Sequence, residues 1–264
     1  MKNLLLMLSI SVLLYSCGSE GDTSIGMGDT NEQAGKGGST TKFAIVDHYL
    51  YIVEKSQLKT INISDPADPK EVDNITINDE LETIFPYEYN GETVLLLGAT
   101  NGMHVYQIGA EGKPNIGEAV VLAHQRSCDP VVAYDGYAYV TLRSSEVWGC
   151  SQGFNQLHAI ALDLNDLSNL NKDPSPILMD GPKGLSLSDD GDALLVCDKN
   201  SLKIYSLFED PANPAERNER SDIKCNDILQ YKDQYIITGD NLLKVYSFDP
   251  MTYELKEEVN LLSL

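Results

Sequence analysis

The chain has 264 residues, of which 42% are hydrophobic, so it is long enough to bury a substantial core in one large all-β domain or in two smaller domains. Its formal net charge of −21 at pH 7 predicts a well-solvated surface. Because phosphate binding needs a basic stripe and the sequence contains no cluster of Lys and Arg, we expect no nucleic-acid partner.

The first 16 residues predict a lipoprotein signal peptide. Lys2 is followed by an apolar run from Leu4 to Tyr15, which is too short for a membrane span of about 20 residues but typical of a signal peptide. The run ends in LYSC (14–17), which resembles the lipobox of bacterial lipoproteins, although Tyr15 is bulkier than the small residue usual there. The resemblance implies that Cys17 becomes the first mature residue and carries the acyl chains that bind the membrane. A buried first strand is the alternative.

Residues 17–41 predict a flexible tether behind the lipid anchor. They are rich in Gly, Ser, Thr, Asn and Asp and lack a hydrophobic period, and a coil of this kind spans about 25–30 Å. The small acidic stretch 18–22 resembles the surface-export signal of lipoproteins in the Bacteroidota. Together these features predict an outer-membrane lipoprotein exposed at the cell surface.

Residues 42–264 contain an internal repeat with five units. Each unit has one apolar run, and these runs start 44, 44, 56 and 42 residues apart. The five runs are YLYIV (49–53), TVLLL (93–97), YAYVT (137–141), ALLVC (193–197) and YIITG (235–239). A second apolar run follows in every unit, at 58–63, 103–108, 157–162, 202–207 and 243–248.

Turn residues separate the runs in a pattern typical of antiparallel strands. The dipeptides Asn-Gly (90–91), Asp-Gly (135–136) and Asp-Gly (190–191) predict hairpins before the first run, and DPADP (65–69) and DPANP (210–214) form one recurring loop after the second. A unit of about 44 residues with four strands is typical of a propeller blade. The sequence therefore predicts an all-β fold, a β-propeller of about five four-stranded blades. Residues 157–167 have helical spacing, but their place in the repeat favours a strand.

Residues 36–250 contain a series of short segments with a shared character. They are KGGS (36–39), FAIV (43–46), ETIFP (82–86), NGM (101–103), CDPVV (128–132), YAYVTLR (137–143), NQL (155–157), GL (184–185) and VCD (196–198). These segments resemble the LVIVD-repeat proteins, β-propeller-like lipoproteins found mainly in the Bacteroidota. The resemblance implies the fold and the cellular location but assigns no activity. Where Pro-His-Gly-Leu is expected, this chain has Lys183 in place of His, so a role that needs an imidazole is in doubt.

Four cysteines besides Cys17 predict two disulfides in an oxidising compartment. Cys128 precedes the first strand of the third unit, and Cys150 lies in that unit's turn between the two central strands. Cys197 ends the second strand of the fourth unit, and Cys225 precedes the first strand of the fifth. Since these positions meet at the same end of the blades, we expect the pairs Cys128–Cys150 and Cys197–Cys225. No Cys-x₂-Cys spacing indicates a zinc site.

The first strands of propeller blades line the central channel, so side chains at their heads are expected to converge. Counting back from each central strand gives five positions in register: Thr41 or Lys42, Glu82, Asp129, Lys183 and Asp227. Arg143 and the insertion 144–156, which carries Trp148, lie at the same end. Aromatic and convergent polar groups suit a small-ligand or sugar site. The alternative is a water-filled polar channel that only holds the blades together.

Three motifs suggest chemistry that their context does not support. Ser151 lies in a Gly-x-Ser-x-Gly match, but the match falls in a loop without the strand and helix of a nucleophile elbow. The acidic stretch 189–192 has Asn200 where a calcium loop needs Glu, and hairpin formation explains it. His48, His104, His124 and His158 have no mutual ligand spacing. We therefore predict no catalytic residue, no metal and no cofactor.

Three functions remain open. We favour a binding or interaction module on the cell surface, whose ligand is a glycan or a protein. The alternatives are a glycan-active enzyme that uses channel carboxylates, which requires one carboxyl group of raised pKa, and a purely structural envelope protein.

Overall fold

The computed structural model describes residues 40–89, 91–100, 102–115, 120–123, 130–144, 155–163, 176–240 and 242–263. All of them belong to one compact unit formed by residues 33–264. The signal peptide, Cys17, most of the tether and the residues Cys128, Asp129, Trp148, Cys150 and Ser151 lie outside the described residues. Within the described ranges, no helix is long and apolar enough to reach across a membrane.

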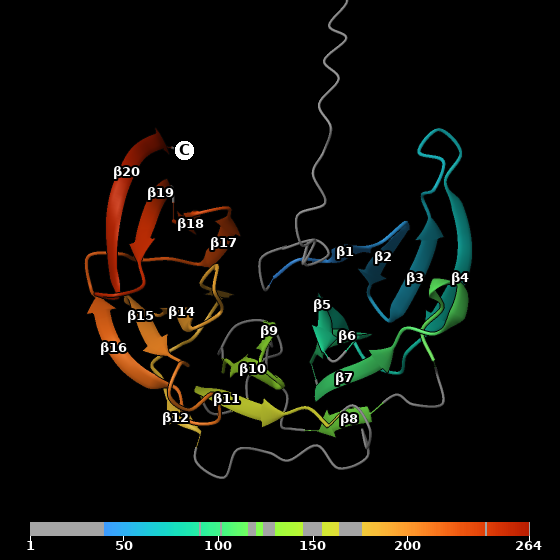
Figure 1. The fold of residues 1–264 in the computed structure, drawn as a ribbon, viewed down its shortest axis with the longest axis horizontal. Coiled ribbons are helices and arrows are strands. Elements are labelled where there is room, and N and C mark those ends of the chain that lie inside the picture. Colours follow the sequence, from blue (N-terminus) through green and yellow to red (C-terminus); the bar gives the residue numbers. More distant parts are fainter. Residues whose placement is uncertain are drawn as a thin grey trace, which may run out of the picture. The chain divides into compact units, whose positions relative to one another are not determined.

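Five four-stranded antiparallel sheets make up this unit, and in each sheet the strands are neighbours in chain order (Figure 1). The predicted all-β architecture of five four-stranded units is thereby confirmed. A single 3-10 turn, η1 (Ala110–Gly112), is the one helical element of the described residues. The sheets are β1 (Phe43–Val46), β2 (Tyr49–Glu54), β3 (Gln57–Asn62) and β4 (Lys70–Thr76); β5 (Leu81–Tyr89), β6 (Glu92–Ala99), β7 (Gly102–Gln107) and β8 (Val120–Ala123); β9 (Val131–Tyr134), β10 (Tyr137–Leu142), β11 (Gln156–Ala161) and β12 (Ile177–Leu178); β13 (Leu185–Leu187), β14 (Ala193–Asp198), β15 (Ser201–Ser206) and β16 (Ala215–Arg220); and β17 (Asp227–Tyr231), β18 (Gln234–Gly239), β19 (Leu242–Asp249) and β20 (Glu254–Ser263).

Tight hairpins join the first and second strands, as the turn dipeptides predict. Asp135 and Gly136 connect β9 to β10 with φ values of 46° and 78°, which match a two-residue turn with both residues in the left-handed region. Gly191, at φ 81°, precedes β14, and a Cβ there would lie 2.0 Å from the ring of Tyr134. Only glycine therefore suits this position, since both its dihedral angle and the neighbouring ring exclude a side chain.

The first strands of successive sheets lie next to one another. Contacts join β1 to β5, β5 to β9, β9 to β13 and β13 to β17, while the fourth strands lie at the periphery in Figure 1. This arrangement is the one expected for propeller blades, in which first strands surround the axis. The segments that precede the first strands therefore meet at one end of the unit.

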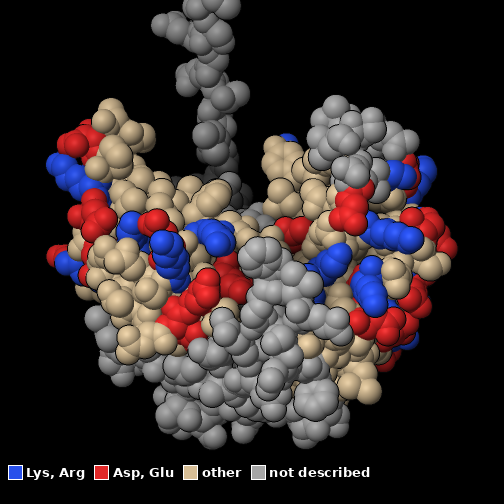
Figure 2. Space-filling model, turned by 180° about the vertical axis from the view of Figure 1, so that it is seen from behind, with Lys and Arg blue, Asp and Glu red and all other residues tan. Residues whose placement is uncertain are grey.

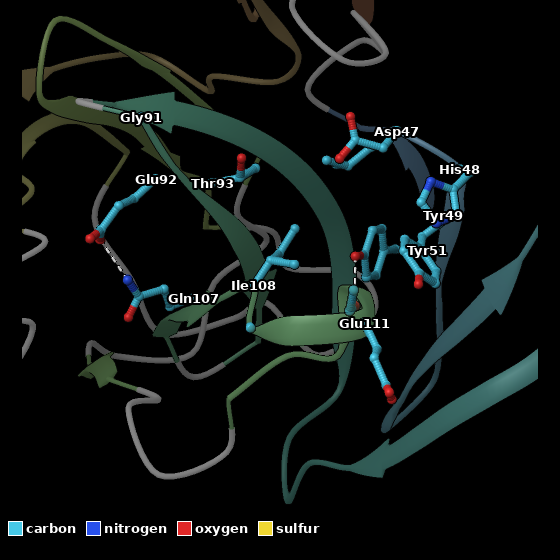
Figure 3. Close-up of a pocket in the computed structure, with 13 residues that line it drawn as sticks. Asp47, His48, Tyr49, Tyr51, Gly91, Glu92, Thr93, Gln107, Ile108 and Glu111 are labelled. Atoms are coloured by element: carbon cyan, nitrogen blue, oxygen red, sulfur yellow. Dashed lines mark hydrogen bonds between the residues drawn. The ribbon is translucent and has the colours of Figure 1, made fainter.

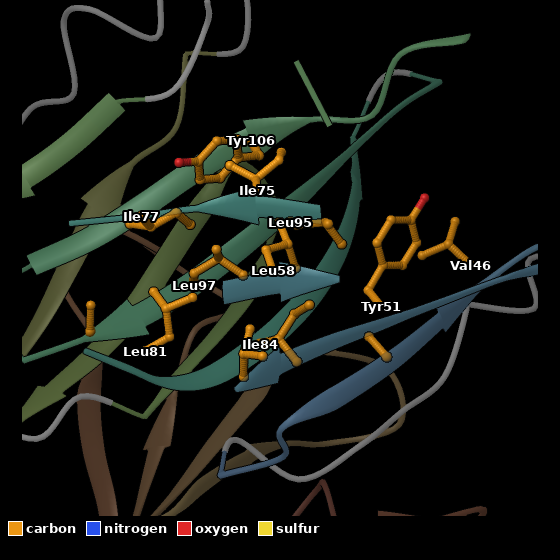
Figure 4. Packing of buried hydrophobic residues seen from close by; sticks show 13 residues of the cluster. Val46, Tyr51, Leu58, Ile75, Ile77, Leu81, Ile84, Leu95, Leu97 and Tyr106 are labelled. Carbon is orange, nitrogen blue, oxygen red and sulfur yellow. The ribbon is translucent and has the colours of Figure 1, made fainter. Parts of the chain in front are cut away.

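Four clusters of buried hydrophobic side chains hold the sheets together, and each cluster joins two sheets that are consecutive in the chain. The cluster between the first and second sheets includes Tyr51, Leu58 and Leu97 (Figure 4). Neighbouring residues of one strand serve different clusters, since Leu97 faces the first sheet and Leu96 the third. This covering on both faces explains the near-continuous apolar runs of the central strands.

No corresponding cluster of the described residues joins the fifth sheet to the first. Thr40 Oγ1 donates a hydrogen bond to the carboxylate of Asp227 at the heads of β1 and β17. That contact is polar. Among the described residues, the first and fifth sheets are therefore not joined by an apolar interface like the four that join consecutive sheets.

Two further predictions from the sequence concern residues that the structure describes. The segment with helical spacing begins as strand β11, in register with β10, as the repeat predicts. A disulfide joins Cys197 at the end of β14 to Cys225 before β17, with Cα atoms 5.4 Å apart. The bond links the fourth and fifth sheets within their shared core, where both cysteines are buried. The predicted Cys128–Cys150 pair lies outside the described residues.

Candidate functional site

A cavity of about 500 Å³ lies where the segments before the first strands meet. Every one of the five sheets contributes to its wall, as expected for a position near the axis. We refer to it as the head pocket. Its lining consists of Thr40, Lys42, Glu80, Leu81, Glu82, Thr83, Pro130, Arg143, Pro182, Lys183, Gly184 and Asn226.

The head pocket brings together four of the residues that the sequence analysis selected. Lys42, Glu82, Arg143 and Lys183 all line it, although they come from four different sheets. Asp227 lies beside it rather than in its lining. Asp129 and Trp148 are outside the described residues. Whether these side chains bind a ligand stays a prediction.

Sequence reasoning missed Thr40, Glu80 and Asn226, which also line the pocket. Asn226 directly precedes the selected Asp227. Because successive side chains near a strand point to opposite sides, a difference of one residue decides which one faces the cavity. The repeat register therefore predicted the correct segment of the chain. The irregular backbone before β17 determines that Asn226, and not Asp227, lines the pocket.

A β-bulge positions Glu82 at the start of β5. Leu81 pairs with Ala99 and Thr83 with Gly98, so Glu82 is the extra residue of this bulge. Bulges of this kind turn a side chain away from the regular alternation of the strand. As a result Glu82 reaches the head pocket, while Leu81 and Thr83 beside it are buried.

The backbone of Lys183 is fixed on both sides by hydrogen bonds. Its N–H donates to the carbonyl of Cys197 at 2.8 Å, and its carbonyl accepts from Thr141 Oγ1 at 3.1 Å. The ammonium group of Lys183 donates to Asn226 Oδ1. The amide of Asn226 donates in turn to Asp240 Oδ1 at 2.9 Å. This chain of hydrogen bonds holds a positive charge at the pocket wall.

A buried carboxylate anchors the segment that leads to Lys183. Asp198 is 1% exposed and its Oδ1 accepts from the N–H groups of Asp180, Gly181 and Lys199 at 3.1, 2.7 and 2.9 Å. The ammonium of Lys203 lies 3.3 Å from Oδ2. Charge-assisted bonds of this kind are stronger than neutral ones, so Asp198 fixes the start of residues 180–184.

Asp227 lies against the pocket wall at the head of β17. A Cβ on Gly184 would come within 2.1 Å of Asp227 Oδ1, so the carboxyl group packs directly on that glycine. Burial raises the pKa of Asp227, and hydrogen bonds from Thr40 Oγ1 and the N–H of Ile228 partly offset this effect. Asp227 therefore keeps its proton to a higher pH than an exposed aspartate does.

The lining of the head pocket is richer in basic groups than the molecule as a whole. Lys42, Arg143 and Lys183 face Glu80 and Glu82, whereas the chain has 19 basic and 40 acidic residues. On the face seen in Figure 2, acidic and basic side chains are interspersed among the described residues. Within the described residues Arg143 has no hydrogen-bonded or ion-paired partner. Three cations and two carboxylates in one cavity suit a polyhydroxylated ligand that carries an anionic group.

A second cavity, of about 550 Å³, lies between the first and second sheets at the opposite ends of their first strands (Figure 3). Tyr51 Oη donates to the carbonyl of Gly112 at 2.7 Å beside it, and Gln107 Nε2 donates to Glu92 Oε2 at 2.5 Å. Only two sheets contribute to its wall, and the sequence analysis selected no residue there. Across the described residues, no group of three or more His, Cys, Asp or Glu side chains is placed to hold a metal ion.

The sheet series and the axial position of the head pocket define a β-propeller-like protein with a polar site at the heads of its first strands. Residues 37–76 match the model of the LVIVD repeat, which confirms the repeat recognised in the sequence. No curated protein matches the chain in sequence.

Solved structures resemble this fold at low sequence identity. A candidate 6-phosphogluconolactonase from Bacteroides fragilis is 12% identical with a TM-score of 0.64, and the match covers 84% of this chain and 70% of that one. The periplasmic gluconolactonase PpgL of Pseudomonas aeruginosa is 16% identical with a TM-score of 0.63, over 82% and 68% of the two chains. A protein of unknown function from Desulfotomaculum acetoxidans is 14% identical with a TM-score of 0.64, over 83% and 68%. At these identities the likeness concerns the fold alone.

Proposed function

We propose that the protein is a cell-surface binding module that holds a small acidic carbohydrate, such as a sugar acid, in the head pocket. The convergence of Lys42, Arg143 and Lys183 from three different sheets is the observation that supports this. Their charges oppose the net charge of −21, so their gathering in one cavity is not a property of the surface in general. Cationic groups bind the carboxylate of the ligand, while Glu82 and Asn226 accept or donate hydrogen bonds to its hydroxyl groups.

The anchor completes this proposal. Acyl chains on Cys17 attach the protein to the outer membrane, and the tether of residues 17–41 carries the propeller at the cell surface. Labelling of cells with a radioactive fatty acid tests it, because label is expected on the wild-type chain and not on Cys17→Ser. Label retained on the variant contradicts the anchor without affecting the proposal for the pocket.

Calorimetric titration of the full chain in mild detergent tests the binding site. D-gluconate, whose lactone gives the Pseudomonas aeruginosa neighbour its name, is the first probe, and D-glucose is the neutral control. Lys183→Met is expected to weaken gluconate binding about tenfold or more, because one charge-assisted hydrogen bond is lost. Lys256→Met removes an equal charge from the outer strand β20 and is expected to leave the affinity unchanged. Equal binding of glucose and gluconate, or equal loss in both variants, contradicts the proposal.

Catalysis is a second candidate because of one observation, the raised pKa of Asp227 beside the pocket. A carboxyl group that keeps its proton to higher pH serves as a general acid, which a hydrolase of lactones or glycosides requires. Incubation of the wild-type chain with gluconolactone, compared with Asp227→Asn, separates the two functions. Turnover that the variant loses supports an enzyme, whereas binding without turnover supports the module.

A further inference from the structure

The disulfide between Cys197 and Cys225 connects the two segments that carry Lys183 and Asn226 in the head pocket. The carbonyl of Cys197 accepts the N–H of Lys183 at 2.8 Å, and the N–H of Cys197 donates to the carbonyl of Gly184 at 2.9 Å. Cys225 directly precedes Asn226 in the chain. The covalent bond therefore lies next to the pair in which the Lys183 ammonium donates to Asn226 Oδ1.

Two hydrogen bonds join the same segments. The N–H of Gly184 donates to the carbonyl of Asn226 at 3.0 Å, and the second bond is that of the Lys183 ammonium. Lys183 and Asn226 are half-buried at the wall of a cavity, so water competes for the groups of this pair. Cys197 and Cys225, in contrast, are at most 2% exposed. Of the three connections, the disulfide is therefore the one that fixes how far apart the two segments lie.

The fourth and fifth sheets are also joined at their outer strands, independently of the disulfide. Arg220 Nη1 donates to the carbonyl of Leu255 at 2.6 Å, and Asn218 Nδ2 donates to the carbonyl of Tyr253 at 2.8 Å. Tyr253 Oη donates to Ser206 Oγ at 2.9 Å. A cluster of buried apolar side chains lies between the two sheets. Loss of the disulfide therefore leaves the sheets packed and acts mainly on the segments at the head pocket.

We infer that the Cys197–Cys225 disulfide positions Lys183 and Asn226 for the ligand, so that the head pocket binds tightly only in the oxidised protein. The inference rests on the proposed binding function of this pocket. In the oxidised chain the ammonium of Lys183 has a fixed place, because the disulfide sets the distance that its bond to Asn226 spans. Donors that are already in place bind more tightly than mobile ones, since binding does not have to order them.

Binding and the redox state of the disulfide are consequently linked. Reduction breaks the S–S bond and takes up two electrons and two protons, which a dithiol such as dithiothreitol supplies as it becomes a cyclic disulfide. Because the oxidised chain binds the ligand more tightly, bound ligand favours the disulfide over the two thiols by the same factor. Tight binding is thereby restricted to an oxidising compartment, which agrees with the location proposed above.

Chemical labelling tests the positioning of Lys183 without a ligand. The full chain carries Cys197→Ala/Cys225→Ala, or Cys197→Val/Cys225→Ala, which fills more of the volume of the buried sulfur atoms. Substitution is used instead of reduction because the chain has five cysteines. Limited acetylation by acetic anhydride, read by mass spectrometry, is expected to modify Lys183 at least about twofold more in both variants than in wild type. Lys256, on the outer strand β20, is expected to react equally in all of them.

Calorimetric titration with D-gluconate then tests the effect on binding. Both cysteine variants are expected to bind about fivefold more weakly than wild type, which is less than the loss in Lys183→Met because the charge is still present. In a Lys183→Met background, removal of the disulfide is expected to change the affinity by less than about twofold, since the disulfide acts through that side chain. Tyr253→Phe is the matched control, because it removes a contact between the same two sheets away from the pocket, and it is expected to keep the wild-type affinity.

The outcomes separate this inference from the proposed function. Equal labelling of Lys183 in wild type and in both cysteine variants overturns the inference, whether or not gluconate binds. Wild-type affinity for gluconate in both variants also overturns it and leaves the proposed function intact. Increased labelling of Lys183 together with no gluconate binding by the wild type contradicts the proposed function and supports the positioning role of the disulfide.

Discussion

Replacement of Asp198 by alanine is expected to destabilise the protein and to loosen the segment that carries Lys183. The carboxylate accepts three backbone N–H groups and lies 3.3 Å from the ammonium of Lys203, at 1% exposure. Hydrogen bonds to a charged group contribute about 1.5–3 kcal/mol each, and loss of one partner of a buried ion pair costs about 3–5 kcal/mol. Since these contributions overlap, we expect a loss of about 4 kcal/mol in the free energy of unfolding.

Urea denaturation measures this loss. A change of about 4 kcal/mol shifts the midpoint by about 1.5 M urea in a domain of this size. Asp198→Asn keeps Oδ1, which accepts all three N–H groups, and is expected to lose about half as much. The control is Asp210→Ala, which removes an exposed carboxylate that accepts from Ala212 at 3.0 Å and is expected to cost under about 1 kcal/mol. An Asp198→Ala midpoint within about 0.3 M of wild type would refute the reasoning.

Three further predictions concern the head pocket and the disulfide. Gly184→Ala is expected to displace the carboxyl group of Asp227, with which a Cβ would collide, and to weaken gluconate binding in a calorimetric titration. Since burial raises the pKa of Asp227, its protonated form favours folding, so the stability of wild type relative to Asp227→Asn is expected to fall as pH rises above about 4 in urea denaturation. Reduction of the Cys197–Cys225 bond, which closes a separation of 28 residues, is expected to lower stability by about 3.5 kcal/mol, and peptide mapping without reductant checks the pairing.

The architecture could be predicted from the sequence because the repeat supplies the same evidence five times. Single turn signals such as Asp135-Gly136 are weak alone, but they recur in three units before apolar runs at a spacing of about 44 residues, and together they indicate where the second strands begin. The helical spacing at residues 157–167 illustrates the point, since local periodicity favoured a helix and the repeat register favoured strand β11. Tertiary context decides such segments, and the repeat makes that context visible in the sequence.

The open side of the propeller and the detailed lining of the head pocket could not be predicted. Ile52 is half-buried and Leu97 is fully buried, although they occupy the same repeat position and have similar side chains. Nothing in the sequence therefore distinguishes a covered residue from an open one. The choice of Asn226 over Asp227 depends on the backbone before β17, and the orientation of Glu82 depends on a bulge. These features depend on how the sheets pack against one another and on local backbone irregularities. The pattern of residues along the sequence does not show either of them.

A crystal structure of the protein with bound D-gluconate would test the proposed binding site. The account predicts the sugar acid in the head pocket, with its carboxylate within hydrogen-bonding distance of Arg143 or Lys183 and its hydroxyl groups near Glu82 or Asn226. Gluconate bound in the cavity beside Tyr51, or an empty head pocket at saturating ligand, would contradict it.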